Sequence, residues 1–233
     1  MDGLIGASAE ALRLLFTGDR EIWEIVAISF SVSFRAILYI VPLALLCAFA
    51  LAYGTFPGRR VLITVVNALV ALPAVVVGLL LYMLLSSSGP FGGWRLLFTQ
   101  GAMIIGQMIL AFPLLVAMIH VSLQGVDLSA WQTARTLGAG IFRAMLTIMR
   151  EVRFGLIAAI VAGFGRVVSE VGCSIMVGGN ILHHTRNIPT AIALETSKGE
   201  FEQGIALGAV LITLALALNF AVATVRGRDM ARH

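Results

Sequence analysis

The sequence predicts an all-α fold, a polytopic transmembrane helical bundle of about five spans that forms one membrane domain. Two observations support this prediction. Hydrophobic residues make up 59% of the 233 positions and charged residues only 12%, so there are too few charges to cover a water-soluble core. Apolar runs longer than about 18 residues also recur along the chain, and each is long enough to cross a bilayer as a helix.

The expected spans cover residues 24–53, 61–85, 102–121, 154–171 and 205–225. Together they make residues 24–225 the membrane domain. The first span exceeds the roughly 20 residues that a bilayer needs, so it must tilt, bend at Pro42 or protrude. Arg35 is expected near its outer end. Pro73 and Pro113 lie inside the second and third spans and are expected to kink them, because proline removes a helical hydrogen bond.

Positive charge predicts the orientation of the bundle. Segments 54–60, 122–153 and 226–233 hold nine arginines, whereas the opposite loops and the N-terminal segment together hold five basic residues. The positive-inside rule therefore places the N-terminus outside and the C-terminus in the cytoplasm, which requires an odd number of spans. Residues 1–23 are expected to form an amphipathic segment along the interface, and residues 226–233 a cytoplasmic tail. This role of the arginines leaves no reason to expect a nucleic-acid partner.

The long cytoplasmic loop has a helical pattern of its own at about residues 126–150. Asp127 or Ser129 can cap a short helix that ends near Leu137, and Gly138 follows as a helix breaker. A short helix, a glycine turn and a second helix would form an elbow that a partner protein could grip. Spacing alone favours the simpler interpretation, a helical hairpin that ties two spans together.

The same loop resembles a motif of a known family. The stretch TARTLGAG at residues 133–140, after GVDLSAWQ, resembles the EAA loop of ABC importer permeases, in which Glu-Ala-Ala is followed by three residues and Gly. In that family the loop forms the coupling helix that docks on the ATPase subunit. The chain departs from the pattern where Arg150 and Glu151 replace a frequent Leu-Pro, and where Gln132 and Thr133 replace Glu and Ala. The resemblance implies that the ATPase-coupling residues are Gln132, Thr133, Ala134, Leu137, Gly138 and Ala139.

Other segments resemble the molybdate and tungstate branch of these permeases. They are FPGRR at 56–60, NALVALPAVVVGLLLY at 67–82, AGFGRVVSEVGCSIMVGGNI at 162–181 and TRNIPTAIALETSKGEF at 185–201. Molybdate permeases typically carry Gly-Glu-Phe-Gly where this chain has Ser-Glu-Val-Gly, and the latter form is similar to tungstate permeases. The resemblance therefore implies a type I ABC importer permease fold and an oxyanion substrate, with tungstate ranked above molybdate.

The resemblance also implies partners and a location. The permease would be a homodimer in the cell (cytoplasmic) membrane, surrounded by lipid, with an ABC ATPase dimer on the cytoplasmic side and an external oxyanion-binding protein. A P-loop needs Gly-Lys-Ser/Thr, but the only lysine, Lys198, follows Ser197. ATP and Mg²⁺ are therefore expected on the partner ATPase, and this chain is expected to be a transport subunit without ATPase activity.

No catalytic residues, metal site or cofactor are expected in this chain. An enzyme would need a converging nucleophile, base or metal cluster, and the sequence shows none. His183 and His184 have no cysteine or carboxylate at a zinc-type spacing, and Cys47 and Cys173 lie in different apolar spans. A secondary transporter or channel remains the alternative class. It would favour carboxylates deep in the spans, and only Glu170 comes close.

Polar residues around the end of the fourth span are the candidate site. Arg166 and Glu170 are spaced i,i+4, and a structural ion pair is the favoured interpretation of two charges in a span. Neutral donors could line a path that a dianion crosses quickly, because fixed cations would hold the ion too tightly. Helix packing or capping is the simpler interpretation of each of these donors, which are Ser169, Ser174, Thr185 and Asn187.

Overall fold

The computed structural model describes residues 20–125, 136, 138 and 140–230. Every regular element in these ranges is a helix, which confirms the all-α prediction for the described part of the chain. In chain order the helices are α2 (Arg20–Tyr53), α3 (Arg59–Leu69), α4 (Ala74–Leu85), the 3-10 helix η1 (Gly92–Trp94), α5 (Gln100–Gln124), α7 (Ile141–Glu151), α8 (Arg153–Val168), α9 (Gly172–Gly178), α10 (Ile188–Lys198) and α11 (Phe201–Met230).

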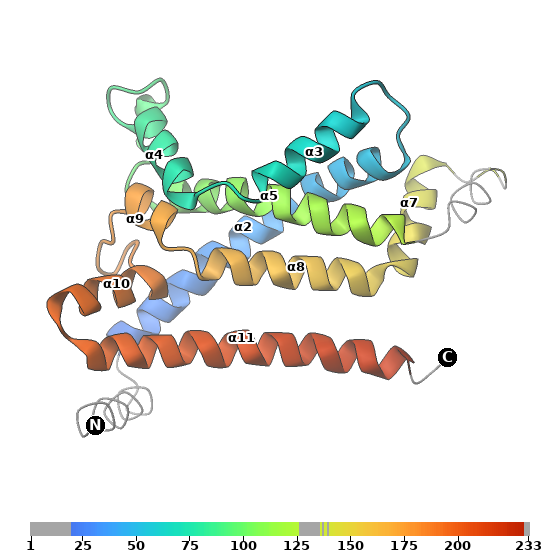
Figure 1. Ribbon diagram of the computed structural model, residues 1–233. Helices are drawn as coiled ribbons and strands as arrows, with labels where there is room; N and C mark the ends of the chain where they lie inside the picture. Colours follow the sequence, from blue (N-terminus) through green and yellow to red (C-terminus); the bar gives the residue numbers. More distant parts are fainter. Residues whose placement is uncertain (1–19, 126–135, 137, 139, 231–233) are drawn as a thin grey trace.

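Long helices run from one end of the molecule to the other (Figure 1). Helices α5, α8 and α11 lie nearly side by side, and α2 crosses them obliquely with its most extensive contact on α5. Helices α9 and α10 lie at one end of the bundle, called the α10 end below. The opposite end carries α7 and is called the α7 end. Helices α3 and α4 form a V that projects from the side of the bundle.

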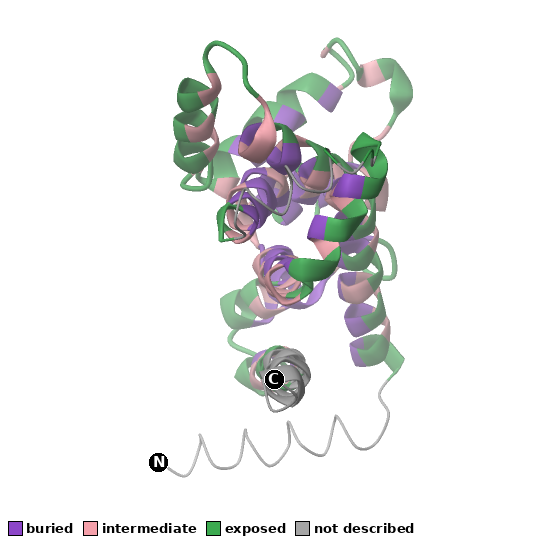
Figure 2. Cartoon of the chain, turned by 90° about the vertical axis from the view of Figure 1, so that its right-hand side faces the viewer, coloured by how far each residue is buried: buried purple, intermediate pink, exposed green. Residues whose placement is uncertain are grey.

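The core lies where α2, α5 and α8 meet, and Figure 2 shows buried residues gathered at the middle of the molecule. Leu115 and Ile119 of α5 are fully buried there. The outward faces are apolar too: Phe34 of α2 is 61% exposed and Phe220 of α11 is 72% exposed. A water-soluble bundle would place polar residues on such faces, whereas lipid needs none. The apolar composition therefore serves both the core and the lipid surface.

The spans match the sequence prediction only in part. By length and composition, α2 and α5 can each cross a membrane as one helix, and the pairs α3–α4 and α8–α9 pass only as bent pairs. The described helices thus supply up to four of the five expected spans. The fifth expected span lies in α11, whose apolar part, Phe201–Ala217, is shorter.

The second span is two helices at 98° to each other rather than one kinked helix. The break ends at Pro73, which precedes α4 with φ −65° and ψ 123°. Proline has no N–H to donate and disfavours helical geometry in the residue before it, so the bend has a local cause. Pro113, which was also expected to kink its span, leaves α5 unbroken, and α2 likewise continues through Pro42. The ring of Pro113 is buried against neighbouring helices, which can compensate for one lost hydrogen bond.

Gly78 brings α4 close to α9 and supplies the first prediction. A Cβ at this position would lie 2.9 Å from Cα of Cys173 and 3.0 Å from Cβ of Met176. Gly78→Ala is therefore expected to lower the free energy of unfolding by about 1–3 kcal/mol through overpacking, although alanine favours a helix by about 1 kcal/mol. Thermal unfolding of the detergent-solubilised protein measures this change. Gly165→Ala in α8 is the control, because a Cβ there meets nothing within 4 Å. Equal unfolding temperatures for the two variants would contradict the prediction.

Candidate functional site

Glu170 stabilises the break between α8 and α9 by bonding to residues of both helices. Its carboxylate is buried, and Oε2 accepts a hydrogen bond from Nη1 of Arg166 at the end of α8. Its other oxygen, Oε1, accepts from the backbone N–H of Gly172 at 2.8 Å and of Cys173 at 3.4 Å, where α9 begins. A carboxylate at a helix N-terminus and a cation at a helix C-terminus are both favourable. The Arg166–Glu170 ion pair therefore joins two helix ends within a bent span.

Two of the candidate donors, Thr185 and Asn187, form hydrogen bonds with backbone groups. Thr185 is fully buried, and its Oγ1 donates to the carbonyl of Gly178 at 2.6 Å and accepts from the N–H of Ile181 at 2.9 Å. Asn187 caps α10, because its Oδ1 accepts from the N–H of Thr190 at 3.1 Å. The single O–H of Thr185 is thus already used. These hydrogen bonds organise the segment between α9 and α10.

The two serines differ from each other. Ser169 is exposed, and its hydroxyl donates to the carbonyl of Gly165 at 2.9 Å in its own helix. Ser174 is 1% exposed, and its Oγ has no partner among the described residues. No hydrogen bond joins any two of these four side chains in the described part of the chain. Among them, only the Ser174 hydroxyl is both buried and unpartnered.

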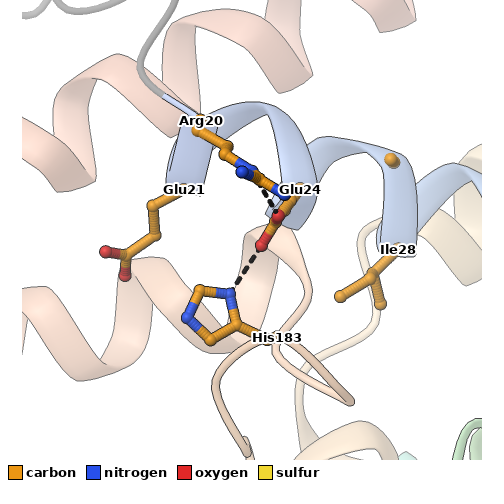
Figure 3. A pocket seen from close by; sticks show the side chains of 6 residues that line it. Arg20, Glu21, Glu24, Ile28 and His183 are labelled. Atoms are coloured by element: carbon orange, nitrogen blue, oxygen red, sulfur yellow. Dashed lines mark hydrogen bonds and ion pairs between the residues drawn. The ribbon is translucent and has the colours of Figure 1, made fainter.

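An open pocket of about 640 Å³, with four charged or titratable side chains among its six lining residues, lies at the α10 end (Figure 3). Glu24 of α2 stands at its centre, bonded to Nε of Arg20 at 3.2 Å and to Nδ1 of His183 at 2.6 Å. Glu21 faces the same segment and pairs with Arg186 at 3.3 Å. Nothing in the sequence indicated that His183 pairs with Glu24, because 159 residues separate them. The described residues contain no group of three side chains suited to a metal ion.

Arg35 lies farther along the same helix and has only neutral partners. Its Nε donates to the carbonyl of Ser31 at 3.0 Å, and its Nη2 donates to Oγ of Ser31 and to Oε1 of Gln100 at 2.8 Å. Nε2 of Gln100 in turn donates to the carbonyl of His184 at 2.9 Å. One chain of hydrogen bonds thus connects α2, the start of α5 and the segment before α10. The sequence indicated only that Arg35 lies near the end of a span.

Sequence comparison finds relatives along almost the whole chain. The tungstate uptake system permease protein TupB of Campylobacter jejuni is 37% identical over 220 residues, which are 94% of this chain and 92% of that protein. A probable anion ABC transporter permease protein of Haloferax volcanii is 39% identical over 90% of this chain and 93% of its own length. The molybdenum transport system permease protein ModB of Escherichia coli is 34% identical over 84% and 89%, respectively. The chain belongs to the tungstate and molybdate permeases of ABC importers. No family model matches it.

Solved structures agree with this family in their fold. An amino acid ABC transporter chain superposes with a TM-score of 0.66 at 16% identity, covering 92% of this chain and 96% of that one. A chain of the inward-facing MetNI methionine ABC transporter gives a TM-score of 0.64 at 17% identity, covering 91% and 96%. The fold is therefore that of an ABC importer permease.

The expected coupling loop is described only in part. Five of its six expected coupling residues lie outside the described residues: Gln132, Thr133, Ala134, Leu137 and Ala139. Gly138 is described and has φ +84°, and a Cβ there would meet nothing within 4 Å. Helix α7 follows, and its first two residues, Ile141 and Phe142, are 62% and 73% exposed. An apolar surface thus lies beside the glycine turn.

Arg59, in the FPGRR stretch of the permease, caps the C-terminal end of α2. Its Nε donates to the carbonyl of Leu51 at 2.5 Å, and its Nη2 donates to that of Ala52 at 3.0 Å. The hydroxyl of Tyr53 donates to the carbonyl of Leu123 at 3.3 Å beside it. Carbonyls in the last turn of a helix lack intrahelical partners, and a basic side chain can satisfy them. Sequence analysis missed this role, although an arginine a few residues beyond a helix end is a signal for it.

The Arg166–Glu170 ion pair gives the second prediction. Glu170→Gln keeps an oxygen for the N–H groups of α9 but removes the negative charge, leaving the Arg166 guanidinium without its counter-ion. The free energy of unfolding is expected to fall by about 1–3 kcal/mol, because the buried partner of a part-buried pair loses its charge. Thermal unfolding of Glu170→Gln, Arg166→Gln and the double variant measures the coupling. Arg20→Gln is the control, since Arg20 is 93% exposed in its pair and such pairs contribute less than about 1 kcal/mol. Strictly additive effects in the double variant would show that the two charges do not interact.

Proposed function

We propose that this permease translocates tungstate, with molybdate as the second candidate ion. The main observation in favour of tungstate is that the chain is 37% identical, over 94% of its length, to a protein named for tungstate uptake. The TupB protein of Peptoclostridium acidaminophilum supports this, with 36% identity over 90% of the chain. The ModB relative matches less of the chain, 84%, at 34% identity. The Ser-Glu-Val-Gly form at residues 169–172 supports the same order.

Transport by the assembled importer tests this proposal. The permease, its ATPase and its external binding protein are placed in proteoliposomes, and uptake of tungstate, molybdate and sulfate is measured at equal concentrations. Tungstate is expected to be taken up in preference to both other ions. Equal or faster uptake of molybdate or sulfate would reverse the ranking. The isolated permease is expected to hydrolyse no ATP, so robust hydrolysis by the pure chain would contradict the assignment of ATP binding to a partner.

We propose that the α7 end faces the cytoplasm and the α10 end faces outside. Arg59, Arg60, Arg143, Arg150 and Arg153 all belong to segments at the α7 end, and positive residues concentrate on the cytoplasmic side of membrane proteins. The glycine turn at Gly138 and the exposed Ile141 and Phe142 lie at that same end. This arrangement puts the coupling loop where an ATPase subunit can dock.

We also propose a homodimer whose route for the ion lies at the two-fold axis. Helix α3 has no buried residue in the single chain, and α4 exposes Val75, Leu79 and Met83. The V formed by these two helices therefore offers a large apolar surface that a second copy can cover. One set of about five helices is also thin for enclosing a path, and two-fold dimers are the commonest oligomers. Crosslinking between cysteines placed on α3 or α4 of two copies would test the interface.

The turn at Gly138 gives the third prediction. A β-branched side chain at φ +84° is strained, and at this turn it would also stand at the docking surface. Gly138→Val is expected to leave the dimer intact while lowering both binding-protein-stimulated ATPase activity and tungstate uptake at least about fivefold, the effect of losing about 1 kcal/mol of docking free energy. Both activities are measured in proteoliposomes that hold the complete importer.

Gly58 supplies a matched control for this measurement. It has φ +83°, a Cβ there meets nothing within 4 Å, and it lies in the neighbouring loop of the α7 end. Gly58→Val therefore introduces the same backbone strain away from the coupling loop, and it is expected to change the two activities less than twofold. Equal losses of activity in the two variants would show that backbone strain alone causes the loss. Normal activity in Gly138→Val would show that this loop is only a structural hairpin.

A further inference from the structure

Arg35 carries a positive charge that the rest of the described chain does not neutralise. Its hydrogen-bond partners are the carbonyl and hydroxyl of Ser31 and the side-chain oxygen of Gln100, all of them uncharged. The described ion pairs join other residues and leave Arg35 without a carboxylate partner. Three of its five N–H groups serve these bonds. The remaining nitrogen, Nη1, bonds to no described residue, and it is not among the buried atoms that lack a partner.

The position of Arg35 along α2 places this charge at the outer boundary of the membrane. From Arg35 to Tyr53 the helix advances 18 residues, or about 27 Å at 1.5 Å per residue, and the apolar layer is roughly 30 Å thick. With the end of α2 at the cytoplasmic boundary, the backbone of Arg35 therefore lies close to the outer edge of the apolar layer. The guanidinium bonds to Ser31, one turn nearer the N-terminus, so the charge lies at this edge, where an anion arriving from water can reach it.

A polar face of α2 leads from the pocket at the α10 end to Arg35. Glu24, Ile28, Ser31 and Arg35 are spaced by four, three and four residues and so share one face of the helix. Glu24 and Ile28 line the pocket of about 640 Å³ (Figure 3), and the acids at its rim are paired with basic groups: Glu24 with Arg20 and His183, Glu21 with Arg186. An anion that enters this pocket thus meets carboxylates whose charge is offset.

We propose that Arg35 contacts the transported oxyanion at the outer mouth of its route through Nη1, an inference that rests on the proposed import function. A guanidinium offers paired N–H groups that match the oxygen spacing of a tetrahedral oxyanion better than an ammonium does. Ser31 and Gln100 orient the guanidinium without cancelling its charge, so the charge remains available for the ion.

The experiment uses the complete importer in proteoliposomes, with tungstate as the probe. Arg35→Gln removes the charge, Arg35→Lys keeps the charge without the planar fork, and Gln100→Leu keeps the arginine without its tether. The control is Arg95→Gln, which removes an exposed arginine after η1, in the connection that leads into the α10 end of α5. Uptake, binding-protein-stimulated ATPase activity and the thermal unfolding temperature are measured for each variant.

Tungstate uptake is expected to fall at least about tenfold in Arg35→Gln, the size of effect expected for one charge-assisted contact. Arg35→Lys and Gln100→Leu are expected to retain clearly more uptake, Arg95→Gln to match the wild type, and stimulated ATPase activity and unfolding temperature to persist in all variants. Wild-type uptake in Arg35→Gln would overturn the role of Arg35 alone. Equal losses in Arg35→Gln, Arg35→Lys and Gln100→Leu, with falling unfolding temperatures, would overturn it in favour of a structural tether. Absence of oxyanion uptake by the wild-type importer would overturn the proposed function and this inference together.

Discussion

Hydrocarbon offers no hydrogen bonds, so a membrane-spanning chain must satisfy its own backbone wherever a helix stops. An unsatisfied backbone group in such a medium costs several kcal/mol. The described chain has two bent helix pairs and therefore has interior helix ends to satisfy. At the α8–α9 break the Glu170 carboxylate accepts from two backbone N–H groups at the start of α9 while it pairs with Arg166. The hydroxyl of Ser169 donates to carbonyls at the end of α8, so neighbouring side chains satisfy both helix ends.

The segment between α9 and α10 follows the same rule. Thr185 bonds two backbone groups, Asn187 caps α10, and Oγ of Ser29 in α2 accepts from the N–H of Ile188 at 2.6 Å. Polar side chains that could serve an anion are thus needed first for the fold. The same conclusion holds at the α7 end, where Arg59 satisfies the last carbonyls of α2. Arg35 differs from these residues, because its partners leave both its charge and one nitrogen available.

The bend at Pro73 shapes the surface proposed for the dimer. The 98° bend separates the directions of α3 and α4, so that α4 packs against α9 while α3 keeps no buried residue in the single chain. In water such an exposed apolar helix would be unstable, since its amphipathic face would have nothing to cover it. In a membrane the same surface can meet lipid or a second subunit. The fold of one chain is therefore compatible with the assembly that an ABC importer requires.

The sequence by itself determined the features that depend on neighbouring residues. Apolar runs specified an all-α membrane bundle, Pro73 specified a bend, and the i,i+4 spacing brought Arg166 and Glu170 onto one side of the chain. Family resemblance then supplied the transport function. Only the tertiary structure decided which polar groups meet across long separations, such as Arg35 with Gln100, 65 residues away, and Glu24 with His183. It also decided that the polar stretch before α11 contains α10, and that the chain breaks between α3 and α4 just before Pro73 while α5 continues through Pro113. Periodicity records which residues share a helix face, but these outcomes depend on how helices pack against one another, and that packing is a property of the whole chain.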